Sequence, residues 1–134
     1  MNKITLTFFS ICCCCLSLTV IAQELLSPEA YVKADIEARR VTLNGMEARL
    51  ALIQKSANIT EQSRLAEETR QNVEAVFARY GVTGASHAAY GTRHLKAIFA
   101  WLEVHPDEWQ EQYNNLVVRF DALSSQFDNL SNRR

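Results

Sequence analysis

Cysteine is missing from most of the sequence, and the four cysteines that it has all lie near its start. Cys12–Cys15 are consecutive, and residues 23–134 contain none. That part of the chain therefore cannot form a disulfide bond, attach haem through a Cys-x-x-Cys-His motif or bind a metal through thiolates. An oxidising compartment is compatible with this composition, although the chain makes no use of it.

Proline and glycine are also scarce, with two prolines and four glycines in 134 residues. Pro28 and Pro106 both stand where a helix would begin. No stretch alternates apolar and polar residues as a half-buried strand does. With few helix-breaking residues and no strand pattern, the chain is predicted to be all-α.

The first 22 residues have the organisation of a secretory signal peptide. Lys3 supplies the basic start, and Ile4–Ile21 is an uncharged run of 18 residues. The small residue Ala22 precedes the polar Gln23, so cleavage is predicted after Ala22 and the protein is expected to be secreted or periplasmic. Residues 1–22 are then the signal peptide, and residues 23–134 form a single domain.

Two other interpretations of this segment stay open. A run of 18 uncharged residues is just long enough for a retained membrane anchor. The small residue at the cleavage position favours removal instead, which leaves no stable membrane anchor. Acylation of Cys12 is the other interpretation, and the large Ile11 before it disfavours lipidation.

Neither sign of charge dominates the predicted mature chain. It has 13 basic and 15 acidic residues, a net charge of about −2, and no block of like charge apart from Arg133 and Arg134. A nucleic-acid partner requires a basic surface, so none is expected.

The strongest periodic pattern lies near the C-terminus. Large apolar residues follow one another at steps of four and three: Trp109, Tyr113, Leu116, Phe120, Leu123, Phe127 and Leu130. This spacing keeps them on one face of an α-helix. Burying one large apolar side chain contributes about 1.5–3 kcal/mol, so this face is expected to pack against other helices.

Three further helices are predicted before it, each preceded by a polar residue that can cap its first turn. They span about residues 28–57, 61–80 and 84–104, with caps at Ser27, Thr60 and Thr83. The first helix includes Gly45, at a cost of about 1 kcal/mol. Gly81 ends the second helix, because glycine readily adopts left-handed backbone geometry.

Four amphipathic helices joined by short loops favour antiparallel neighbours. The predicted fold is therefore an antiparallel up-down four-helix bundle with a long first helix. A core of three helices, with one end of the first helix projecting toward a partner, is the alternative.

The third predicted helix carries a face of rings. His87, Tyr90, His94 and Trp101 follow one another at helical steps. The two histidines are about 10 Å apart along the axis, too far to bind one metal ion together. No metal site is therefore predicted from this helix alone. The face is either a partly wet packing seam or, since surplus rings often anchor interfaces, a partner-binding surface.

Arg39 interrupts the apolar face of the first helix, where a buried unpaired arginine would be costly. Three interpretations remain. Its side chain extends outward from the edge of the seam, it pairs with an acid across the bundle, or it binds an anionic ligand.

Other chemistry has little support in the sequence. Met46 with a histidine has the residue types of a haem-ligand pair, but Met46 occupies a core position, so no cofactor is predicted. Ser86 and His87 lack the surroundings of a nucleophile motif, and the protein is not expected to be an enzyme.

The sequence thus favours a small exported helical protein that acts by binding another protein, as an adaptor, chaperone-like factor, inhibitor or accessory subunit. Its interface candidates are His87, Tyr90, His94, Trp101 and Arg39. A ligand-, metal- or haem-binding bundle is the alternative.

The signal-peptide interpretation predicts the N-terminus of the exported protein. Expression of the full chain in a secreting bacterial host should yield a protein that begins at Gln23. N-terminal sequencing or intact-mass spectrometry measures this directly. Recovery of the uncleaved chain in the membrane fraction would instead support the retained anchor.

Overall fold

The computed structural model describes residues 26–131, which form five helices and no strand. The bounds of the helices are α2 (Pro28–Gln54), α3 (Ile59–Arg79), α4 (Gly84–Arg93), α5 (Leu95–Val104) and α6 (Pro106–Ser131). The all-α prediction is confirmed. The predicted signal peptide lies outside the described residues.

Polar caps begin three of the helices. The Ser27 hydroxyl accepts a hydrogen bond from the backbone N–H of Ala30 at 3.1 Å, as expected for a cap before Pro28. Thr83 and Ser86 form a capping box at the start of α4. These two predicted caps are confirmed.

The cap predicted at Thr60 is wrong. Asn58 takes that role, and its side-chain oxygen accepts a hydrogen bond from the backbone N–H of Glu61 at 2.9 Å. Asn58 therefore starts α3 two residues earlier than the sequence indicated. At the other end of this helix, Gly81 has a φ of +73°, the left-handed geometry expected of its terminator.

α2 packs against α3 along a row of small residues. Ala34 and Ala38 are buried against Val76 and Phe77 of α3. About two turns beyond Ala38 on α2, a Cβ atom at Gly45 would lie only 2.3 Å from the Oγ1 atom of Thr69. The absence of a side chain at Gly45 therefore allows the two backbones to approach closely, and this is why the long helix contains a glycine.

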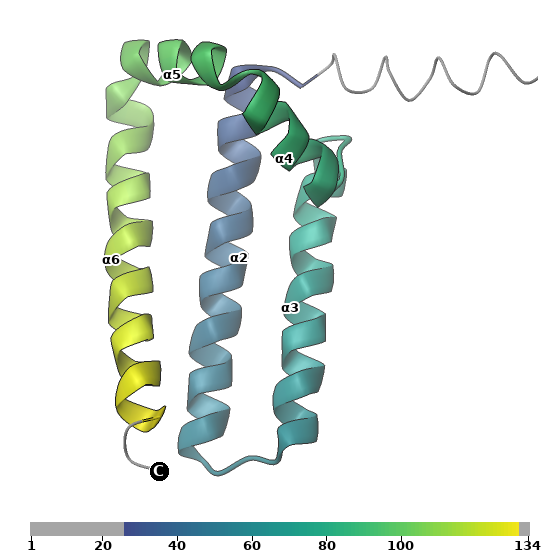
Figure 1. The fold of residues 1–134 in the computed structure, drawn as a ribbon, viewed down its shortest axis with the longest axis vertical. Coiled ribbons are helices and arrows are strands. Elements are labelled where there is room, and N and C mark those ends of the chain that lie inside the picture. The colour runs from purple at the N-terminus through teal and green to yellow at the C-terminus, as the bar shows by residue number, and fades with distance from the viewer. Residues whose placement is uncertain (1–25, 132–134) are drawn as a thin grey trace, which may run out of the picture.

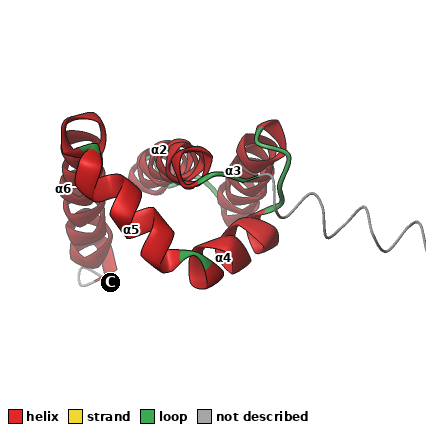
Figure 2. Ribbon diagram, turned by 90° about the horizontal axis from the view of Figure 1, so that it is seen from above, coloured by secondary structure: helices red, strands yellow, loops and turns green. Residues whose placement is uncertain are grey.

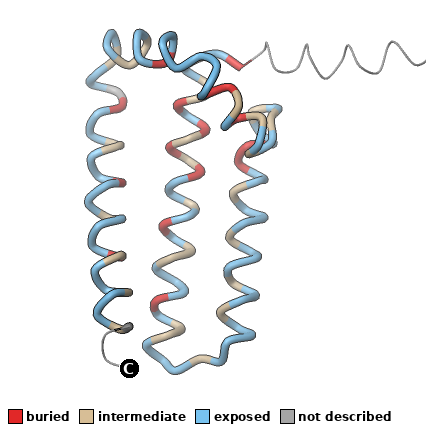
Figure 3. Tube along the Cα trace, viewed as in Figure 1, coloured by how far each residue is buried: buried red, intermediate tan, exposed pale blue. Residues whose placement is uncertain are grey.

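α2 packs against α6 along a row of large residues. The buried side chains of Ile36, Leu43 and Leu50 belong to one apolar core with Leu116 and Leu123 of α6. The edge of this contact is polar, and Arg119 of α6 donates hydrogen bonds to Asn44 and Glu47 of α2. α2 is therefore packed on two sides, and its buried positions recur along its length (Figure 3).

The single helix predicted over residues 84–104 is wrong. The helix breaks at His94, and the two parts, α4 and α5, run in different directions (Figure 1). Gly91 and Thr92 precede the break; glycine has a low helix propensity, and the Thr92 hydroxyl bonds back to the carbonyl of Ala88. The break lets α4 contact α3 while α5 turns toward α6.

The predicted four-helix bundle is not confirmed. α3, α2 and α6 lie side by side with α2 between the other two, and α4 and α5 cross one end of this row on one side (Figure 2). The three long helices agree in number with the alternative prediction of a three-helix core. That prediction also had one end of the first helix projecting toward a partner, but Leu50, near the far end of α2, is buried. None of the helices within residues 26–131 has the length and apolar character that a bilayer span requires.

The close approach of α2 and α3 gives a stability prediction. In an exposed helix, replacing glycine by alanine stabilises by about 1 kcal/mol. Gly45→Ala should instead destabilise the protein by about 1–3 kcal/mol, because the new methyl group meets the stiff side chain of Thr69. Chemical denaturation measures the free energy of unfolding. The exposed Ala51 of α2 supplies the matched control, since Ala51→Gly should show only the propensity cost; a stabilised Gly45→Ala variant would contradict the packing.

Candidate functional site

A long apolar groove of about 470 Å³ lies along α2, between α3 and α6. α2 forms its floor and the other two helices form its walls. Its lining residues are Asp35, Ala38, Arg39, Thr42, Leu43, Val73, Phe77, Tyr113, Leu116, Val117 and Phe120. Large apolar side chains remain exposed on the α6 wall, where Val117 is 57% and Phe120 is 51% exposed.

The groove begins on α2 one turn after the contact between α2 and α4. Tyr31 of α2 stacks on the His87 ring of α4, with ring centroids 4.1 Å apart. Asp35, Arg39 and Thr42 follow Tyr31 at steps of four, four and three, so they share its side of α2. No residue of α4 is among the described residues that line the groove, so the groove extends along α2 away from that contact.

A polar cluster lies at the Asp35 end of this groove. The Arg39 Nε donates a hydrogen bond to the Oδ2 of Asp35 at 2.7 Å, and the Tyr113 hydroxyl donates to the same oxygen at 3.0 Å. Burial and the neighbouring Asp35 carboxylate raise the pKa of Tyr113, and the hydrogen bond to Asp35 raises the pKa of the Arg39 guanidinium. The cluster therefore contains a permanent cation and a neutral phenol.

Arg39 is not buried in the helix seam. Its side chain is 59% exposed, and its ion-pair partner Asp35 lies one turn away on the same helix. This geometry agrees with the interpretation in which the side chain extends outward. The partner acid is on α2 itself, so pairing across the bundle, as the second interpretation required, is wrong.

The ring-bearing face predicted around His87 is divided between core and surface. His87 and Tyr90 are buried, and a ring nitrogen of His87 makes a hydrogen bond of 3.0 Å to the backbone carbonyl of Tyr31. Gly91 allows this contact, because a Cβ there would lie 2.4 Å from the Tyr31 hydroxyl oxygen. His87 and Tyr90 thus hold α4 against α2, and their side chains are not presented to a partner.

The other two members of that face belong to different surroundings. His94 is exposed at the helix break and stacks on Tyr90. Trp101 is half-buried and stacks on His105, with its ring 5.1 Å from that of Trp109. A continuous surface of His87, Tyr90, His94 and Trp101 therefore does not form.

The remaining candidate ligands do not converge. Met46 is half-buried and packs against the main core. Within residues 26–131, no three His, Cys, Asp or Glu side chains are grouped so that they could hold a metal ion. The structure thus gives no support from these residues to a metal-binding or haem-binding interpretation.

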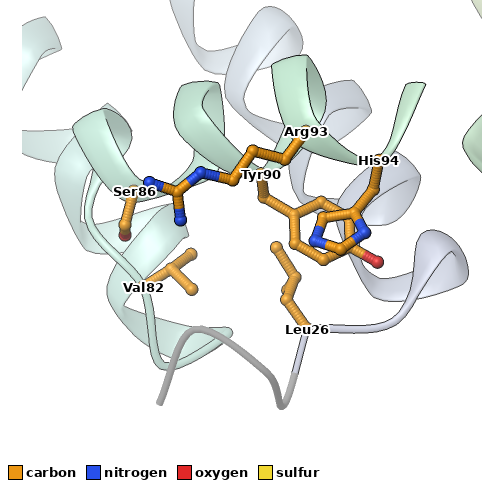
Figure 4. Close-up of a pocket in the computed structure, with 6 residues that line it drawn as sticks. All are labelled: Leu26, Val82, Ser86, Tyr90, Arg93 and His94. Atoms are coloured by element: carbon orange, nitrogen blue, oxygen red, sulfur yellow. The ribbon is translucent and has the colours of Figure 1, made fainter. Parts of the chain in front are cut away.

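A small cavity of about 20 Å³ lies beside Tyr90, above the start of α2. Figure 4 shows the ring of Tyr90 between His94 and Arg93, with Leu26 and Val82 beneath it. A space of this size holds about one water molecule. It is therefore a packing defect at the junction of helices rather than a ligand site.

The groove itself was not predicted from the sequence. Phe120 and Tyr113 belong to the apolar stripe of α6, which was expected to be buried throughout. The signal that was available is Val117, which widens the stripe beyond one face of the helix. A stripe wider than one helix can cover indicates a second neighbour, and no helix among the described residues covers Val117 or Phe120 there.

No protein-family model, curated protein or solved structure matches this chain. The function is therefore inferred from its own residues and their geometry.

The tyrosines give a prediction for alkaline conditions. Burial raises the pKa of all four tyrosines, most strongly that of Tyr113, which also faces Asp35. Unfolded tyrosines ionise near a pKa of about 10, whereas the folded ones keep their protons to higher pH. The contribution of the tyrosines to the free energy of unfolding should therefore be constant from neutral pH to about pH 10 and fall above it.

The measurement is denaturant unfolding across this pH range, with tyrosinate absorbance recorded in parallel. Tyr113→Phe should lose less stability between neutral and alkaline pH than the unmodified protein. Ionisation of every tyrosine in the native protein near pH 10, without loss of stability, would contradict the burial of these groups.

Proposed function

We propose that this protein acts by binding another protein, which places an amphipathic helix in the groove. The supporting observation is that two large apolar side chains of the α6 wall, Val117 and Phe120, stay more than half exposed in a groove that is lined mainly by apolar residues. Exposed contiguous apolar surface on a small protein is typical of an interaction site.

The arrangement of the helices supports the shape of this partner. α2 has α3 on one side and α6 on the other, and those two helices make little contact with each other. A fourth helix supplied by another chain would lie opposite α2 and pack against both walls. The predicted four-helix bundle is in this proposal completed by the partner.

The proposal includes export of the protein after cleavage at Ala22, and a binding role without catalysis. Among the interface candidates from the sequence, Arg39 lines the groove and belongs to the proposed contact. His94 and Trp101 lie at the α4–α5 end of the molecule and would contact only a partner that extends beyond the groove.

Binding of a small apolar ligand is a second candidate function. The groove volume of about 470 Å³ is within the range of about 300–1,000 Å³ that is usual for ligand pockets, and its lining is mostly apolar. This candidate agrees with the alternative drawn from the sequence.

The test is site-specific photo-crosslinking in the native host. A photoreactive residue at Val117 should form adducts with a partner, because this side chain lines the groove. The matched control is Val118, the next residue, which is 67% exposed and lies about 100° around α6 from Val117. Mass spectrometry identifies each adduct.

Adducts from position 117 that are absent from position 118 would support the proposal. Equal adducts from both positions, or none from either, would contradict it. The Val117→Arg variant should abolish partner capture, while Val118→Arg should leave it unchanged, and both substitutions should preserve the fold because the positions are exposed.

A further inference from the structure

We propose that the groove also binds an amphipathic carboxylate, an apolar chain with one carboxylate at its end, and that Arg39 holds the carboxylate. A medium-chain fatty acid is the simplest molecule of this class. This inference rests on the groove of the proposed function and deepens its second candidate, because it names the chemical class of the small molecule and the residue that binds its charged end.

The first supporting observation is the unused hydrogen-bonding capacity of Arg39. Its Nε donates to Asp35, and among the described residues its two terminal Nη groups have no partner. A guanidinium presents its donors in a planar fork that matches a carboxylate. Arg39 can therefore keep Asp35 and bind a second carboxylate through its Nη groups.

The second observation is that this guanidinium is oriented before any ligand arrives. Asp35 is held by two donors on one oxygen, the Arg39 Nε and the Tyr113 hydroxyl. Tyr113 is half-buried, so its hydroxyl is fixed by packing. Orientation of the binding group in advance lowers the entropy cost of binding.

The third observation concerns the charge of the ligand. Among the described residues that line the groove, only Arg39 and Asp35 are charged. Both hydrogen bonds to Asp35 go to its Oδ2 atom, whereas the Nη groups of Arg39 are positively charged donors, which favours an anion on that side of the cluster. Nearby Asp35 would repel a second negative charge, so a monoanion fits better than a dianion.

The fourth observation concerns the rest of the ligand. Beyond the cluster, the groove is lined by Leu43, Val73, Leu116, Val117 and Phe120. Leu43 and Leu116 are already buried, so an alkyl chain would gain mainly by covering the exposed Val117 and Phe120 and the half-buried Val73, in proportion to the area covered. A groove with a polar cluster at one end and apolar side chains beyond it matches a molecule that has one polar end and an apolar chain.

The same groove would then have two occupants that exclude one another. An alkyl chain against Phe120 occupies the space in which the partner helix would pack. Binding of a fatty acid in the groove would therefore weaken the capture of the protein partner.

The test uses dodecanoate as the probe, below its micelle concentration, in isothermal titration calorimetry with the protein that begins at Gln23. Methyl dodecanoate has the same chain without the charge and is the matched ligand control. Dodecanoate should bind at least roughly tenfold more tightly than the ester, as expected for hydrogen bonds to a charged group. Equal affinities, or no binding of either molecule, would overturn the inference.

Variants separate the two ends of the site. Arg39→Leu should weaken the binding of dodecanoate by roughly tenfold and leave the affinity for the ester unchanged. Arg39→Lys should recover only part of the lost affinity, because lysine lacks the planar fork of donors. The matched control is Arg64→Leu, an exposed arginine paired with Glu68 on α3. An unchanged affinity in Arg39→Leu would overturn the role given to this residue.

Phe120→Ser should weaken the binding of both ligands. Phe99→Ser on α5, where the side chain is exposed to a similar extent, should weaken the binding of neither. Thermal unfolding followed by circular dichroism shows whether each variant is folded. If dodecanoate does not bind but position 117 still gives specific crosslinks, the ligand inference fails and the proposed function stands. If both are negative, both fail.

Discussion

The fold depends on the packing of α2 against two neighbours at once. On one side Ala34, Ala38 and Gly45 allow α3 to approach closely, and on the other Ile36 and Leu43 meet the large residues of α6. Because α2 presents small residues to α3 and large residues to α6, it holds these two helices on opposite sides of itself. The remaining side of α2 near Arg39 is then not covered by either neighbour, and this side is the floor of the groove.

The break at His94 directs α4 and α5 to different neighbours. α4 folds against α2 through Tyr31 and His87, while α5 carries the chain across to α6. No residue of either helix is among the described residues that line the groove, and Val117 and Phe120 stay exposed on its α6 wall. A cluster of Arg39, Asp35 and Tyr113 lies in the same groove. The proposed binding roles follow from this geometry.

Much of the fold could be predicted from the sequence. The Ser27 and Thr83 caps, the terminator Gly81 and the periodicity of α6 are local signals, and each acts through residues within a few turns. The break at His94 follows Gly91 and Thr92, which are weak helix-breaking signals within a periodic apolar stretch. The burial of His87 depends on Tyr31, more than fifty residues away, and no local pattern encodes that contact. The groove could not be predicted for a similar reason, because Phe120 has the spacing of the buried stripe, but no helix among the described residues covers it and its side chain stays 51% exposed.

The most direct test of the uncovered floor of α2 is the reactivity of single thiols, since residues 23–134 contain no cysteine of their own. Cysteine is introduced at 116, 117 or 118, and the rate of alkylation is measured in the purified native protein. Val117→Cys should react nearly as fast as Val118→Cys and many times faster than Leu116→Cys, which is buried against α2. Protection at 117 equal to that at 116 would mean that the groove is covered in the isolated protein, and it would contradict this account.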